Sequence, residues 1–179
     1  MTLTASAARN EWLEQFRRLE FQKSEALGLL DDKASLEYKP KPDSWNKLEV
    51  IQHLVLAEQG FLRQAASPGV HWKTKVPVPI GKLVVWIVFT FGFRVKSPAK
   101  STLPFETLTY EEVADRWNAV REQLRVFLVS GEAKKAYPFF HPLSGRMSTM
   151  KLLRFLEIHT GHHIKQIRRI EQSRIGSPT

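Results

Sequence analysis

The sequence predicts an all-α protein, a single four-helix bundle, on three observations. Four segments repeat apolar residues with the 3.6-residue period of an amphipathic helix. No segment alternates apolar and polar residues convincingly, so we expect no sheet beyond an incidental short pair of strands. With 179 residues, 42% of them apolar, the chain suits one domain with a full core, which we expect to span residues 1–179. These features together are typical of a four-helix bundle.

The first two predicted helices lie between residues that break helices. The first covers about residues 6–30, and the prolines of the KPKPDS stretch end it because proline cannot continue a helix. Its apolar stripe comprises Trp12, Phe16, Leu19, Ala26 and Leu30. The second covers about residues 45–66, with Ser44 as its predicted N-cap, and stops at the Ser-Pro-Gly turn of residues 67–69.

The third and fourth predicted helices carry capping and charge signals at their ends. The third covers residues 109–129, with Thr109 as its cap and two glutamates in its first turn. Its stripe is the most regular in the chain and comprises Val113, Trp117, Val120, Leu124 and Phe127. The fourth runs from about Ser148 to Ser173, and its basic C-terminal end suits the helix dipole.

A long connection, residues 67–108, separates the second and third predicted helices. It is longer than a simple link in a compact domain needs. Within it, residues 83–93 (LVVWIVFTFGF) are almost entirely apolar, but this segment is too short to cross a bilayer, which needs about 20 residues. We expect a short apolar helix packed over one end of the bundle. The alternative is a segment that lines a substrate site or binds a membrane surface.

Composition limits the classes of function. The chain has no cysteine, so disulfides and thiolate metal sites are excluded, and any metal must be held by His, Asp or Glu. The formal charge of +9 favours anionic partners, but the basic residues are dispersed and the tightest run is KQIRR. We therefore do not expect a nucleic-acid-binding protein. The N-terminus lacks the apolar stretch of a secretory signal, so we expect a cytoplasmic location without a transmembrane segment.

The motif HTGHHIKQ, residues 159–166, places three histidines close together. At about 100° per residue, His159 and His163 share the core-facing stripe of the fourth helix, whereas His162 lies on its flank. Two imidazoles one turn apart on one face can bind a single metal ion. They can also be core residues that are satisfied by hydrogen bonds. The pair alone leaves both interpretations open.

A third metal ligand is expected from a facing helix, and the second helix offers His53 beside small residues that leave room for a site. Glu49, one turn earlier, is predicted to orient this imidazole or to be a further ligand, unless it is an ordinary glutamate at a helix start. Gln166 is predicted to hydrogen-bond a ligand imidazole or, alternatively, to pack as an ordinary polar residue. Glu58 lies about 140° around the helix from His53 and is predicted to be on the surface.

Three motifs in this order resemble those of the DinB-like superfamily. They are W-x-x-x-E-V-x-x-H-L at residues 45–54, H-P-L-x-G-R-M at residues 141–147 and H-x-x-x-H-x-x-Q-I at residues 159–167. The resemblance runs to about Gln172, is weakest in the long connection, and is closest to the YfiT-type branch of metal-dependent hydrolases and bacterial thiol transferases. It implies a four-helix bundle, often a homodimer, that holds one divalent metal ion, nickel or zinc, through three histidines.

Carried over residue by residue, the resemblance implies that His53 is the ligand from the second helix, and that His159 and His163 are the pair from the fourth. His141 matches a position that is usually structural, and the alternative is a catalytic or metal-ligand role. The resemblance also implies a small-molecule substrate and either hydrolysis or the transfer of a low-molecular-weight thiol, with no catalytic side chain identified. Three histidines and an open position describe a catalytic metal site. The alternative is a non-catalytic metal-binding or interaction module that uses residues 83–93 on a partner or a membrane surface.

Overall fold

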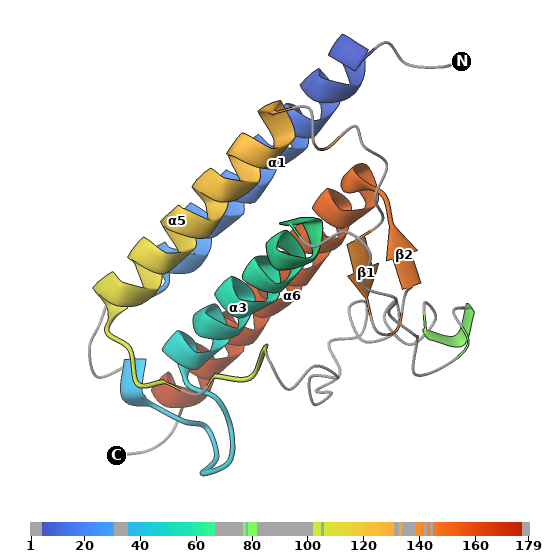
Figure 1. Ribbon diagram of the computed structural model, residues 1–179. Coiled ribbons are helices and arrows are strands. Elements are labelled where there is room, and N and C mark those ends of the chain that lie inside the picture. Colours follow the sequence, from blue (N-terminus) through green and yellow to red (C-terminus); the bar gives the residue numbers. More distant parts are fainter. Residues whose placement is uncertain are drawn as a thin grey trace.

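The computed structural model is mostly helical, and the predicted all-α fold is confirmed (Figure 1). The structure describes residues 5–30, 36–66, 77, 79–81, 102–104, 106–130, 133, 139–141, 143 and 145–176. The apolar segment 83–93 lies outside these residues, so the short helix expected there stays a prediction. Within the described part of the chain, no helix is both long and apolar enough to span a membrane.

Four long helices of the described chain pack side by side (Figure 1). They are α1 (Ala5–Gly28), α3 (Lys47–Ala66), α5 (Tyr110–Val129) and α6 (Thr149–Ile175). Both α1 and α3 pack against α5 and α6, so that α1 lies diagonally opposite α3. Each helix therefore has two neighbours and must bury a wide arc of its surface.

Side-chain caps fix where α5 and α6 begin. Thr109 Oγ1 accepts a hydrogen bond from the Glu112 N–H at 3.2 Å, and Glu112 Oε2 accepts one from the Thr109 N–H at 2.8 Å. This reciprocal pair is a capping box, which satisfies amides that the first turn of a helix leaves without partners. Ser148 caps α6 by accepting from the Lys151 N–H. The starts predicted at Thr109 and Ser148 are thus confirmed.

The helix α3 begins two residues later than predicted, because its cap is Asn46 rather than Ser44. Asn46 Oδ1 accepts from the Glu49 N–H, and Glu49 Oε2 accepts from the Asn46 N–H, both at 2.8 Å. Ser44 instead closes the preceding turn through the backbone of Lys41. The helix therefore starts with the same kind of capping box as α5.

The apolar core consists of two clusters, one toward each end of the bundle. The cluster where α3 and α5 begin includes Val50, Ile51, Leu54, Trp117, Ile164 and Ile167. The cluster at the opposite end includes Leu19, Phe61, Leu124, Phe139, Leu152 and Leu156. Between them lies a set of buried polar residues, which we call the middle polar layer and which comprises His53, Glu58, Arg121, His159 and His163.

A short hairpin covers the end of the bundle where α6 begins (Figure 1). Its strands β1 (Phe139–His141) and β2 (Gly145–Met147) are antiparallel, with Phe139 opposite Met147. Gly145 has a φ of 73°, a backbone conformation that favours glycine. Both Phe139 and Met147 are buried in the second core cluster. The hairpin matches the expectation of no sheet beyond a short pair of strands among the described residues.

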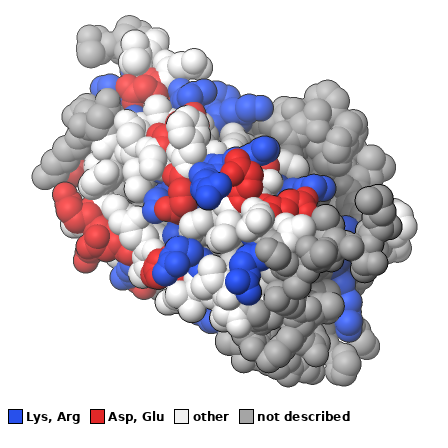
Figure 2. All heavy atoms as spheres, turned by 90° about the horizontal axis from the view of Figure 1, so that it is seen from above, with Lys and Arg blue, Asp and Glu red and all other residues white. Residues whose placement is uncertain are grey.

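Charged residues of both signs lie side by side on the face shown in Figure 2. Exposed ion pairs of this kind include Arg17 with Glu14 within α1, and Arg168 with Glu25 between α6 and α1. Exposed pairs each contribute only about 0–1 kcal/mol. The bundle is therefore held together mainly by its apolar clusters.

Candidate metal centre

The three histidines predicted as metal ligands converge in the middle polar layer. His159 Nε2 lies 3.3 Å from His53 Nε2 and 3.2 Å from His163 Nε2. One nitrogen from each ring lies within 4.8 Å of the other two, and all three side chains are buried. Among the described residues, these three have ligand atoms close enough together to hold one metal ion. We call them the histidine group.

Hydrogen bonds at Nδ1 decide which nitrogen faces the centre of the group. His53 Nδ1 lies 2.7 Å from the carbonyl oxygen of Thr102, and His163 Nδ1 lies 2.8 Å from Gln166 Oε1. An amide oxygen accepts a hydrogen bond and cannot donate one, so each of these rings carries its proton on Nδ1. Their Nε2 atoms therefore turn lone pairs toward His159. Gln166 thus makes a hydrogen bond to His163, one of the predicted ligands.

Converging lone pairs of this kind fit a cation. His159 can place at most one proton on Nε2, so it cannot fully satisfy the two nitrogens that face it. Buried polar groups that lack partners cost free energy, whereas a divalent ion at their common point would engage all three. Imidazole nitrogen suits zinc and nickel. The residues present thus fit the metal site that the resemblance implies.

Burial favours the neutral form of the three rings. It lowers the pKa of His53, although the hydrogen bond to Thr102 acts in the opposite direction. Burial also holds the pKa values of His159 and His163 well below the ordinary histidine value, and repulsion among the neighbouring imidazoles adds to the shift. Because a metal ion binds neutral imidazole, this environment favours the binding-competent form.

The other two described histidines lie beside the group. His162 is half-buried on the flank of α6, with its ring centroid 5.1 Å from that of His163. His141 ends β1 and contacts the ring of Phe155, which stacks on His159. The helical wheel thus separated His162 from the inward pair, whereas the position of His141 depends on the hairpin.

Glu49 lies at the start of α3, and its contacts are those of a capping residue. Its carboxylate accepts from the Asn46 N–H and pairs with Lys39 Nζ at 2.8 Å. Glu49 was predicted to orient the imidazole of His53. The Nδ1 atom of that ring is hydrogen-bonded instead to the carbonyl oxygen of Thr102. Sequence reasoning missed Thr102 because the contact uses a backbone oxygen from the end of the long connection, and no side-chain type signals it.

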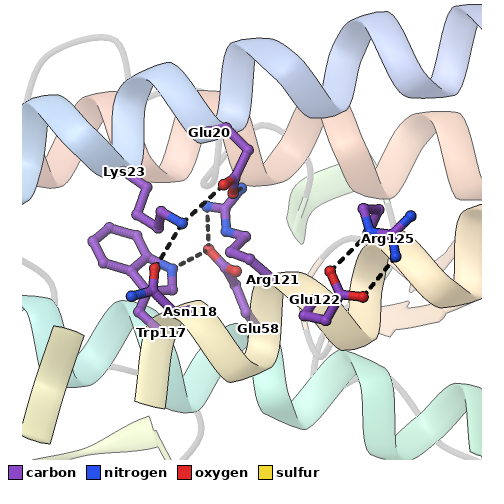
Figure 3. Close-up of polar contacts among 8 residues, drawn as sticks. All are labelled: Glu20, Lys23, Glu58, Trp117, Asn118, Arg121, Glu122 and Arg125. Atoms are coloured by element: carbon purple, nitrogen blue, oxygen red, sulfur yellow. Dashed lines mark hydrogen bonds and ion pairs between the residues drawn. The ribbon is translucent and has the colours of Figure 1, made fainter. Parts of the chain in front are cut away.

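Glu58 is buried, and the prediction that it lies on the surface is wrong. It is 2% exposed, and its Oε1 accepts from Arg121 Nη2 at 2.7 Å and from Trp117 Nε1 at 3.2 Å (Figure 3). Burial raises the pKa of Glu58, and the adjacent Arg121 charge opposes that rise. The prediction failed because α3 packs against α5 as well as α6, so that two separate faces of this helix are buried.

The Glu58–Arg121 pair extends to α1 and forms a balanced set of charges (Figure 3). Lys23 Nζ lies 2.8 Å from both Glu20 Oε2 and Asn118 Oδ1, and Arg121 Nη1 lies 4.0 Å from Glu20 Oε1. Two carboxylates therefore face two cations across three helices. The middle polar layer thus has an ion-paired side, Glu58 of α3 and Arg121 of α5, and a histidine side at α3 and α6.

The comparisons with known proteins agree with this architecture. The family model of the DinB superfamily matches residues 6–167, a range that includes all four long helices in large part and every residue of the histidine group. No curated protein and no solved structure matches the chain. Because the family match covers most of the sequence, the chain belongs to the DinB superfamily.

Proposed function

We propose that this protein is a metal-dependent enzyme that holds one divalent ion, nickel or zinc, through the Nε2 atoms of His53, His159 and His163. The observation that carries the proposal is the convergence of three buried imidazoles, two of which have Nδ1 bonded to an oxygen acceptor. A site with three protein ligands keeps an open position, as catalytic zinc sites do. We propose a small-molecule substrate and either hydrolysis or the transfer of a low-molecular-weight thiol.

Both reactions need the same contributions from the protein. When bound, the ion supplies Lewis acidity that lowers the pKa of a water or thiol nucleophile toward neutrality. The Thr102 carbonyl and the Gln166 amide hold two of the ligand rings in the binding tautomer. The buried setting limits competition from bulk water and strengthens electrostatic interactions within the site. Because the requirements are shared, one experiment should assay the metal-loaded protein for both hydrolysis and thiol transfer.

Turnover with and without a chelator tests the proposal. With zinc or nickel, we expect the protein either to hydrolyse an activated ester or to join a bacterial thiol to an activated aryl halide. In the second reaction a carbon–sulfur bond forms, halide leaves and the thiol proton passes to solvent. Chelation and His163→Ala should each abolish the activity, while His162→Ala should retain it. A metal-loaded protein with neither activity would instead support a non-catalytic metal-binding or interaction module.

We further propose that the protein acts in the cytoplasm as a homodimer. A chain without cysteine needs no oxidising compartment for its fold, which supports the location. The family resemblance supports the dimer, as do large apolar side chains that the single chain leaves exposed, such as Phe21 and Ile175. Light scattering at micromolar concentration should give twice the chain mass, and a strictly monomeric mass would remove the dimer.

A further inference from the structure

His159 lies at the end of a series of aromatic ring contacts. Its imidazole lies over the ring of Phe155, with centroids 5.5 Å apart and an angle of 17° between the planes. Phe155 lies one helical turn earlier on α6 and also contacts Phe61 of α3, at 5.7 Å and 73°. On the hairpin, His141 contacts Phe155 at 4.9 Å and 51°. Ring contacts therefore lead from β1 to a proposed metal ligand.

We propose that His141 is a positioning residue for the metal centre. From the hairpin it holds Phe155 against His159, and this contact aims His159 Nε2 at the point shared with His53 and His163. The inference rests on the proposed metal site, but it adds an element that the three ligands do not include. It also gives the short β1–β2 hairpin a role in the site.

The physical reason is the rotational freedom of an imidazole. The torsion that turns a histidine ring is broad, and only a narrow part of its range aims Nε2 at a common point with two other rings. A stacked Phe155 ring restricts that torsion, and Phe155 is restricted in turn by His141 and Phe61. Groups that orient metal ligands typically contribute about 10- to 100-fold to metal affinity.

Histidine suits this position because it is an aromatic ring with an acceptor nitrogen. His141 Nδ1 accepts from the Leu143 N–H at 3.3 Å, which joins the ring to the hairpin turn. The same turn is packed closely from outside, since a Cβ on Gly81 would collide with the backbone of Leu143. Burial lowers the pKa of His141 to about 4, so the ring is neutral at pH 7 and does not repel a nearby cation.

Loading the protein with Co²⁺ tests the proposal, because the visible spectrum of cobalt reports the arrangement of its ligands. We expect His141→Ala to bind Co²⁺ about tenfold more weakly and to shift the absorption bands. His141→Phe keeps a ring against Phe155 and should retain the wild-type bands. Phe155→Leu removes the middle ring and should change the spectrum as His141→Ala does. If His141→Ala does not fold, Phe155→Leu tests the same contact in its place.

The matched control is Phe127→Leu. Phe127 of α5 packs on Phe139 of β1, at 5.6 Å, and is separated from Phe155 by the rings of Phe139 and Phe61. The control should lower the melting temperature and leave the cobalt spectrum unchanged. The proposal is overturned if His141→Ala leaves the spectrum and the affinity at wild-type values, or if Phe127→Leu shifts the bands equally. A wild-type protein that binds no Co²⁺ would overturn the metal site itself.

Discussion

At the scale of single residues, the tautomers of the histidine group are set by partners that lie outside the group. A backbone carbonyl from Thr102 and a side-chain amide from Gln166 take the Nδ1 protons of His53 and His163. These contacts turn rings that could face either way into rings with a defined Nε2 lone pair. Replacing a ligand and replacing its neighbour should therefore have different consequences.

We predict that His163→Ala abolishes stoichiometric metal binding, whereas His162→Ala leaves it nearly intact. The His163 ring provides one of three converging nitrogens, and the adjacent His162 ring lies on the flank of α6. Equilibrium dialysis against zinc at pH 7.5 measures the difference. Equal effects of the two substitutions would show that the site assignment is wrong.

We predict that the metal-free protein loses stability as the pH falls below about 6.5, the ordinary pKa of histidine. Burial lowers the pKa values of the histidine group, so the folded state takes up fewer protons than the unfolded state as the pH falls. Each histidine that is neutral in the folded state and protonated in the unfolded state lowers the free energy of unfolding by at most about 1.4 kcal/mol per pH unit. His141, whose pKa is about 4, adds to the same slope.

Urea unfolding with a chelator present, between pH 8 and pH 5.5, measures this dependence. The midpoint should be nearly constant above pH 7 and should fall progressively below pH 6.5. His159→Gln should reduce the slope because it removes one of the buried imidazoles. A midpoint that does not change over this range would contradict the assignment of buried, neutral rings.

At the scale of helices, the ion-paired side of the middle polar layer joins α3 to α5. Glu58 and Arg121 are each almost fully buried, and their direct contact is supplemented by Trp117 Nε1. A buried ion pair is weak evidence for stability, because the cost of removing both charges from water offsets most of the attraction. Its effect becomes large when one partner is removed.

We predict that Arg121→Met destabilises the protein by about 3–5 kcal/mol, because Glu58 is left as a buried charge without its partner. The double variant with Glu58→Gln should recover most of that loss, since Gln still accepts from Trp117 and brings no charge. The matched control is Arg125→Met in the exposed Glu122–Arg125 pair of the same helix, which should change little (Figure 3). Chemical denaturation measures the free energy of unfolding of the two single variants and the double variant. If the losses from Arg121→Met and Glu58→Gln add up in the double variant, this account is contradicted.

Sequence patterns predicted those elements whose signal lies within one helix. The wheel of α6 selected His159 and His163, and the Thr109 cap followed from residue types alone. The helical wheel of α3 failed for Glu58, because a wheel drawn for one helix cannot show that the helix has two buried faces. The α3 capping box was missed although its signal, Asn46 followed three residues later by Glu49, is present in the sequence.

Other parts of the site could not be predicted because they depend on contacts between distant segments. The Thr102 carbonyl has no side-chain signature, and the strands of the hairpin are too short to show an alternating pattern. The stacking of Phe155 between His141 and His159 follows only once the hairpin is placed against α6.

At the scale of the whole molecule, the middle polar layer interrupts a core that is otherwise apolar. Its ion-paired side is internally balanced, whereas its histidine side carries converging acceptors. A ligand that binds the folded state alone stabilises it in proportion to the logarithm of its concentration. Metal binding should therefore be visible in the stability of the entire bundle.

We predict that zinc or nickel raises the melting temperature of the wild-type protein. At a free metal concentration of about 100 times Kd, the stabilisation should be about 2.7 kcal/mol. Calorimetry with increasing metal measures the effect, and His53→Ala, which removes the ligand from α3, should abolish it. A melting temperature that rises equally in this variant would indicate binding elsewhere on the protein.

The most direct test of the central claim is X-ray absorption spectroscopy of the protein loaded with one equivalent of zinc. We predict three imidazole nitrogens at about 2.0–2.1 Å from the ion, with the remaining position filled by an oxygen atom from solvent. The His53→Ala protein should show one imidazole fewer or bind no zinc. A wild-type spectrum with fewer than three imidazoles would contradict the assignment of His53, His159 and His163 as the ligands.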